Sequence, residues 1–201
     1  MTESARAGHS ARVTVAVEAP GEGPDRLPEL PEFDEIYQEY FAFVWRSLRR
    51  LGVRPAALED ASQEVFLVVH KRLAEFERRS SLKTWLFGIA LHVARRQARN
   101  AARHPAHELP DPEPASPTAA TPQDEAARRE AIALLYAILD ELDAEKRAVF
   151  VMAELEQMTA PEIAEALRAP MNTVYSRLRA ARREFEAALK RRQARERWRQ
   201  P

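Results

Sequence analysis

The chain contains no cysteine, which excludes disulfide bonds, thiolate catalysis and zinc sites built on cysteine. No stretch approaches the roughly 18 consecutive apolar residues of a membrane span. The run Val13–Val17 is also shorter than the ~7–15 residues of a signal-peptide core. Glycine-rich phosphate loops and paired-histidine metal motifs are missing as well. We therefore expect a cytoplasmic protein without membrane insertion, enzymatic activity or cofactor.

The formal net charge is zero, but the charges are segregated along the chain. Lys71–Arg103 holds nine basic and two acidic residues, and Met171–Gln200 holds ten basic and three acidic. Between them, Asp124–Glu165 holds four basic and eleven acidic residues. Two basic segments around an acidic one predict two separate contacts with a polyanion. Solvated helix faces are the alternative for any one segment.

Prolines divide the chain. Pro105–Pro122 contains six prolines, which favours a semi-extended linker, and the first thirty residues combine prolines and glycines without helical periodicity. The expected organisation is a disordered tail at 1–30, domains at 31–104 and 126–193, a linker at 105–125, and a basic tail at 194–201.

Both domains show apolar residues at helical spacing, and no alternating strand pattern competes. The predicted fold class is all-α, with two small helical domains joined by a flexible linker. Helices are expected at 33–51, after Pro55, after a cap at Ser80 or Ser81, around 132–139 and at 144–156, followed by two short helices.

The strongest local pattern is the segment Thr159–Leu167, a tight turn, and then Met171–Leu178. Thr159 and Glu162 match a capping box. This arrangement is typical of a helix-turn-helix, in which polar residues near the start of the second helix read base edges. Its predicted outer face carries Asn172, Thr173, Ser176, Arg179 and Arg183. A plain helical hairpin is the alternative.

The third expected helix carries a basic stripe. Arg95, Arg99 and Arg103 follow one another at i,i+4 spacing, which costs a free helix a few tenths of a kcal/mol per pair. Phosphates would offset this repulsion. The preceding loop, Phe76–Trp85, combines cations with aromatic rings and suits single-stranded nucleic acid. Burial of Trp85 in the core is the competing interpretation.

The second helix differs, because it carries an acidic flank of Glu59, Asp60, Gln63 and Glu64. Such a surface repels DNA and favours a basic protein partner. Stabilisation of the helix N-terminus is an alternative role for the first two residues.

Five segments together resemble a known family. The runs Glu59–Phe66 and Phe76–Ala90 resemble region 2 of the extracytoplasmic-function (ECF) sigma factors. Region 4 of the same family is similar to the runs Leu142–Phe150, Glu162–Ala164 and Thr173–Leu178. These regions cover about two thirds of the chain in the order that the family has.

The resemblance implies a transcription initiation factor that binds core RNA polymerase, directs it to promoter DNA and helps to open the −10 element. The partners are core polymerase, promoter DNA and, as for many relatives, an anti-sigma factor. The implied core-polymerase residues are Glu59, Asp60, Gln63 and Glu64. The implied −10 residues are Arg78, Arg79, Ser80, Ser81, Lys83, Thr84, Trp85, Arg95, Arg96 and Arg99. The implied −35 residues are Asn172, Thr173, Tyr175, Ser176, Arg177, Arg179, Arg182 and Arg183.

Three positions depart from the family pattern. Arg168 stands at a turn position that is often glycine, Asn172 replaces a usual glycine, and Tyr175 replaces a common lysine. A left-handed Arg168 would cost about 1–2 kcal/mol. A helix-turn-helix regulator without sigma activity is the main alternative function, but it leaves the acidic flank and the basic loop unexplained.

Overall fold

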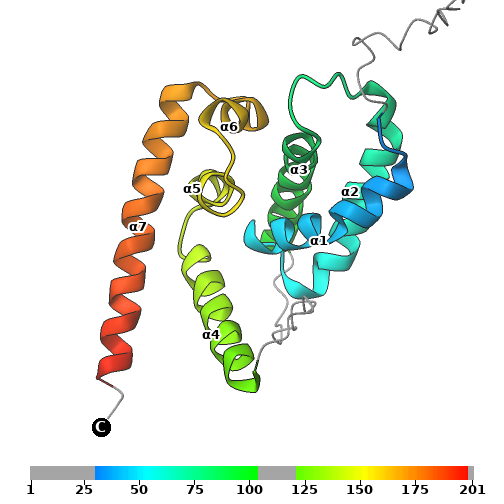
Figure 1. Ribbon diagram of the computed structural model, residues 1–201. Helices are drawn as coiled ribbons and strands as arrows, with labels where there is room; N and C mark the ends of the chain where they lie inside the picture. Colours follow the sequence, from blue (N-terminus) through cyan, green and yellow to red (C-terminus); the bar gives the residue numbers. More distant parts are fainter. Residues whose placement is uncertain (1–29, 104–120, 199–201) are drawn as a thin grey trace, which may run out of the picture. The chain divides into compact units, whose positions relative to one another are not determined.

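The computed structural model describes residues 30–103 and 121–198. Every element within these ranges is helical (Figure 1), which confirms the predicted all-α class. The helices are α1 (Phe33–Arg50), α2 (Leu58–Arg72), α3 (Leu82–Arg103), α4 (Pro122–Leu139), α5 (Ala144–Phe150), α6 (Ala160–Leu167) and α7 (Met171–Arg197). The predicted tail at 1–30 and linker at 105–125 lie outside the described residues, except for Leu30 and residues 121–125.

Helices α1–α3, called the N-terminal block below, pack against one another. The α1 helix begins where Glu32 donates its backbone N–H to the carboxylate of Glu35 at 3.1 Å, and it ends before Gly52, whose φ is +92°. Its inner stripe follows helical spacing because each apolar residue must face the same neighbours. The fully buried residues of this block include Ile36, Val44, Leu48, Val65, Val69, Leu86 and Phe87.

Helices α4–α7 form the C-terminal block. The linker prediction is wrong at its end, because α4 already begins at Pro122. Thr121 and Asp124 form a capping box, and proline is tolerated in the first turn, where its missing N–H has no helical partner. The tail prediction is also wrong for 194–197, because α7 continues to Arg197.

The segment predicted as one helix at 144–156 has two parts. Asp143 caps α5 by accepting from the backbone N–H of Lys146 at 2.9 Å. The chain then widens into a π-helical turn at Val151–Leu155. The turn ends at Leu155, Glu156 caps it, and Gln157 adopts a left-handed conformation with φ +56°. Such π-turns are rare and are frequently found at functional sites.

The two blocks share one hydrophobic core. The described residues from Glu32 onward belong to one compact unit, and α3 packs against α6. Buried residues from both blocks belong to a single cluster, among them Phe43 and Leu86 from the N-terminal block and Met152, Met158 and Ile163 from the C-terminal block.

Candidate nucleic-acid interface

The helix-turn-helix is built as the sequence predicts. The backbone N–H of Thr159 donates to Oε2 of Glu162 at 2.8 Å, which confirms the capping box. The hydrogen bonds that Glu162 accepts from the backbone and the side chain of Thr159 hold the pKa of Glu162 below its ordinary value. Arg168 ends α6 in the left-handed region, at φ 50° and ψ 45°. Its predicted conformational cost therefore applies, and the turn keeps its geometry without glycine.

The α7 helix turns one face inward and one outward. Val174 and Ala181 are fully buried, and the ring of Phe185 stacks on Phe150 with 4.5 Å between centroids. Thr173 and Arg177 are half-buried. The other predicted −35 residues are exposed, namely Asn172, Tyr175, Ser176, Arg179, Arg182 and Arg183.

The arginines of α7 differ in their partners. Arg177 pairs with Glu145 of α5, and Arg182 donates from Nε to Oε1 of Glu154 at 2.7 Å. No carboxylate of the described residues pairs with Arg179 or Arg183. The sequence pattern alone does not separate these two pairs of arginines.

The basic loop runs into the start of α3. Ser81 caps this helix by accepting from the backbone N–H of Thr84 at 3.1 Å, so the second of the two predicted caps is the one used. Arg78 has a left-handed φ of 55°, Arg79 pairs with Glu77, and Ser80 is half-buried.

Trp85 is neither wholly in the core nor fully exposed, so the structure lies between the two interpretations that the sequence offers. Its side chain is half-buried, and its ring lies 5.1 Å from that of Phe76 in a tilted arrangement. The indole therefore packs against the end of the basic loop and is also partly open to solvent.

The cations of α3 do not all point freely to solvent. Lys83 lies 3.1 Å from the carboxylate of Glu156, Arg95 lies 3.8 Å from that of Glu145, and Arg96 pairs with Glu64. Arg99 is exposed. Thr84 is only 3% exposed, and its hydroxyl donates to Glu162 at 3.3 Å.

The acidic flank is smaller than predicted. Glu59, Asp60 and Gln63 are exposed, whereas the side chain of Glu64 is 19% exposed and held by Arg96. Glu64 is therefore a less accessible member of the flank than Glu59 and Asp60, because its place in the helix turns it toward α3.

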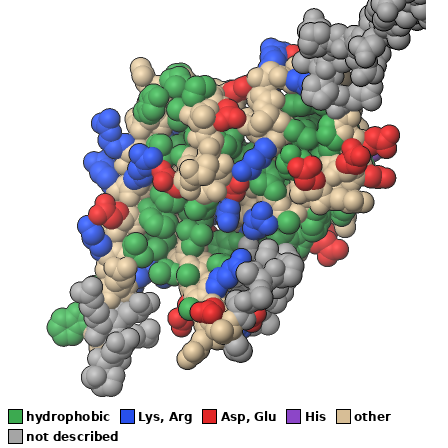
Figure 2. Space-filling view, in the orientation of Figure 1, with side chains coloured by type: hydrophobic (Ala, Val, Ile, Leu, Met, Phe, Trp, Pro, Cys, Tyr) green, Lys and Arg blue, Asp and Glu red, His purple; other side chains and the backbone are tan. Residues whose placement is uncertain are grey.

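Exposed apolar side chains on α1 and α2 were not predicted from the sequence. Tyr37 is 43% exposed and Leu67 is 61% exposed, and the Tyr37 ring lies 4.7 Å from that of Phe66. Helical spacing could have indicated their exposure, since both residues fall outside the inner stripe of their helix. In Figure 2, acidic side chains gather over α1 and α2 and basic side chains along α7.

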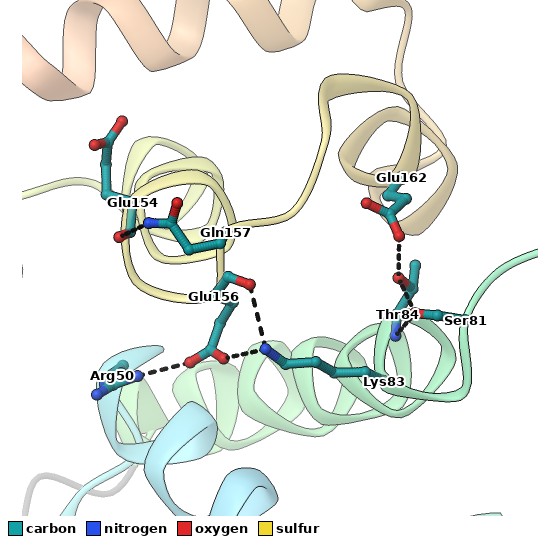
Figure 3. A network of polar contacts seen from close by, with 8 residues as sticks. All are labelled: Arg50, Ser81, Lys83, Thr84, Glu154, Glu156, Gln157 and Glu162. Atoms are coloured by element: carbon teal, nitrogen blue, oxygen red, sulfur yellow. Dashed lines mark hydrogen bonds and ion pairs between the residues drawn. The ribbon is translucent and has the colours of Figure 1, made fainter.

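The structure also contains a functional candidate that the sequence pattern does not reveal. Glu156 follows the π-turn and is nearly buried, with its carboxylate between Arg50 and Lys83 (Figure 3). No local spacing connects residues so far apart in the chain.

No group of three or more metal-ligating side chains comes together within the described ranges. Among the described helices, none is both long and apolar enough to cross a membrane.

Comparison with known families matches both blocks. The family described as "Sigma-70 region 2" matches residues 36–104, and "Sigma-70, region 4" matches residues 132–185. The ECF RNA polymerase sigma factor SigX of Bacillus subtilis is 30% identical over 140 residues, which span 68% of this chain and 70% of SigX. The RNA polymerase sigma factor NccH of Alcaligenes xylosoxydans is 28% identical over 160 residues, covering 78% of this chain and 86% of NccH.

A solved structure shares the fold. The sigma factor RpoE of Bartonella quintana, determined in complex with the anti-sigma factor NepR, superposes with a TM-score of 0.62 at 21% identity and covers 79% of this chain and 96% of RpoE. With both sigma-70 regions matched in order, the chain belongs to the extracytoplasmic-function group of sigma-70 factors, and it is a transcription initiation factor that directs core RNA polymerase to promoter DNA.

Proposed function

We propose that the two blocks divide promoter recognition between them, with the −35 element read by α7. The observation that carries this assignment is the exposed polar face at the start of α7, behind a rigidly capped α6. Asn172, Ser176 and Arg179 lie where a recognition helix meets base edges. Arg182 and Arg183 come later in the helix, where it meets phosphates.

The loop before α3 and α3 itself bind the −10 element. Here Arg78, Arg79 and Arg99 supply positive charge, and the half-buried Trp85 supplies an aromatic face. Charge and stacking together suit a strand that is being separated from its complement.

Core polymerase binds the acidic flank of α2, through Glu59, Asp60 and Gln63. The exposed Leu67 adds apolar area beside them. An acidic surface with a neighbouring apolar contact complements a basic partner. The protein acts in the cytoplasm, where the polymerase works, without catalysing a reaction itself. An anti-sigma factor is a further partner that the relationship to the Bartonella quintana protein suggests.

Transcription reconstituted from core polymerase, the full chain and a library of genomic fragments tests this function. We expect new start sites that share sequence elements near −35 and −10 and that disappear without the protein. A regulator without sigma activity would bind duplex DNA alone and would leave the start sites of core polymerase unchanged. That outcome would reject the proposal.

A further inference from the structure

The carboxylate of Glu156 is the most enclosed acidic group at the contact between the two blocks. Its side chain is 6% exposed. Arg50 donates to Oε1 at 2.6 Å, and Lys83 lies 3.1 Å from Oε2. Lys83 also donates to the backbone carbonyl of Glu156 at 3.2 Å. Both cations come from the N-terminal block and approach the carboxylate from two sides (Figure 3).

The contact extends beyond this carboxylate. The hydroxyl of Thr84 donates to Glu162 at 3.3 Å, and the guanidinium of Arg49 lies 4.4 Å from the ring centre of Tyr136. A Cβ atom added to Gly52 would lie 1.9 Å from Nη1 of Arg147. Polar and apolar contacts therefore join the blocks on several sides of Glu156.

The backbone before Glu156 is specialised. A π-turn ends at Leu155, and the left-handed Gln157 redirects the chain directly afterwards. The side-chain amide of Gln157 donates to the carbonyl of Glu154 at 2.7 Å. These features fix the direction of the Glu156 side chain, and π-turns of this kind are frequent at functional sites.

The same contact occupies part of the −10 surface. Lys83 and Thr84 are in the proposed −10 set, yet the ammonium of Lys83 is bound to Glu156 and Thr84 is 3% exposed. A DNA phosphate and the Glu156 carboxylate would compete for one ammonium group. We propose that Glu156 is a latch that closes the C-terminal block over part of the −10 surface and must be released before that surface binds DNA.

A buried ion pair suits a contact that opens. Each ion loses hydration on burial, so the pair contributes little net stability, whereas removing one partner leaves an uncompensated buried charge. Opening returns the nearly buried carboxylate of Glu156 to water, and it also exposes apolar side chains that the two blocks share. The competition with DNA rests on the proposed −10 function of Lys83, whereas closure of the latch does not.

The absence of cysteine allows a direct distance measurement. Spin labels on Ala98→Cys in α3 and Ala187→Cys in α7, two exposed positions, report the separation of the blocks by pulsed electron paramagnetic resonance. We expect a single short distance in the otherwise unchanged chain. Glu156→Lys should shift the distribution to longer and broader distances, because it places a third cation beside Arg50 and Lys83.

The matched control is Glu186→Lys, an exposed position paired only within α7, and it should leave the distance unchanged. Arg50→Glu combined with Glu156→Lys reverses the pair and should restore the short distance. If Glu156→Lys lowers helicity by circular dichroism, the milder Lys83→Gln takes its place and should broaden the distribution in the same direction.

Three results for the chain without polymerase would overturn the latch. They are a long distance in the unchanged chain, equal distributions for the variants at 156 and 186, and no restoration by the reversed pair. Transcription is not part of the measurement, so failure of the latch is separate from failure of the proposed function. Adding core polymerase to the labelled chain should lengthen the distance, and an unchanged distance in that complex would contradict release of the latch.

Discussion

Glu154 holds Arg182 through a hydrogen bond of 2.7 Å from Nε to Oε1, so the carboxylate neutralises a cation on the outer face of α7. Glu154→Gln should release that charge to DNA phosphates. Binding to a duplex of random sequence should tighten, and the slope of log K against log salt should steepen by about 0.9 for one added contact. Fluorescence anisotropy at several salt concentrations measures both quantities.

Glu186→Gln is the control for this experiment, because it frees Lys190 near the end of the same helix. It should leave the salt slope nearly unchanged if DNA lies along the first half of α7. Equal slopes for the two variants would place Arg182 away from the phosphates.

The left-handed Arg168 offers a stabilising substitution. Arg168→Gly should raise the free energy of unfolding by about 1 kcal/mol, because glycine adopts φ 50° without a Cβ clash. Glu165→Gly, inside α6, should lower it by about 1 kcal/mol, the usual cost of glycine within a helix. Urea denaturation measures both, and a destabilised Arg168→Gly would show that its side chain makes a compensating contact.

The cap of α5 gives a stability effect that depends on pH. Asp143→Ala should lower the free energy of unfolding by about 1 kcal/mol. Bonds to the side chain and backbone of Lys146 hold the pKa of Asp143 below its ordinary value. Its stabilising contribution is therefore complete above the ordinary pKa and is lost as the pH falls through the lowered one. Asp143→Asn keeps the cap without titrating, so its difference from the unchanged chain should shrink on acidification in chemical denaturation.

Charge reversal on the acidic flank tests the polymerase contact. Glu59→Lys with Asp60→Lys should weaken association with core polymerase at least tenfold, about 1.4 kcal/mol, without loss of helicity. Glu125→Lys with Glu130→Lys, at exposed positions of α4, changes the net charge equally and should have little effect. Biolayer interferometry compares the pairs, and similar losses would mean that net charge, not the flank, controls binding.

The recognition helix should divide its work along its length. Alanine at Asn172 or Arg179 should cost about 1–3 kcal/mol on the preferred −35 sequence and relax the preference itself. Alanine at Arg183 should weaken binding to all DNA sequences alike and reduce the slope of log K against log salt by about one. Binding to a randomised −35 library at two salt concentrations distinguishes the groups, and the opposite division would reverse the placement of α7 in the groove.

Local patterns predict the helices and their caps well, because both depend on residues within one turn. The capping box at Thr159 and Glu162 follows from spacing alone, and the cap of α3 falls on Ser81, one of the two residues that the sequence offers. The start of α4 is hidden by the proline density before it, because Pro122 occupies the first turn of the helix, where proline is accepted.

Features that depend on distant residues could not be predicted. Apolar spacing at 144–156 fits an α-helix as well as the observed α-helix followed by a π-turn. Glu64 lies on the acidic flank in sequence, but its pairing with Arg96 requires α2 and α3 to be packed. Contact between Arg50 and Glu156 has no local signature at all.

The two carboxylate oxygens of Glu162 accept hydrogen bonds from different blocks. Oε2 accepts from Thr159 inside the helix-turn-helix, and Oε1 accepts from Thr84 of the other block. Separating the blocks would break the bond of Oε1 to Thr84 and would leave the bond of Oε2 to Thr159 at the start of α6 in place. With this cap kept, the entropy of ordering the start of α6 would not be subtracted from the free energy of promoter binding.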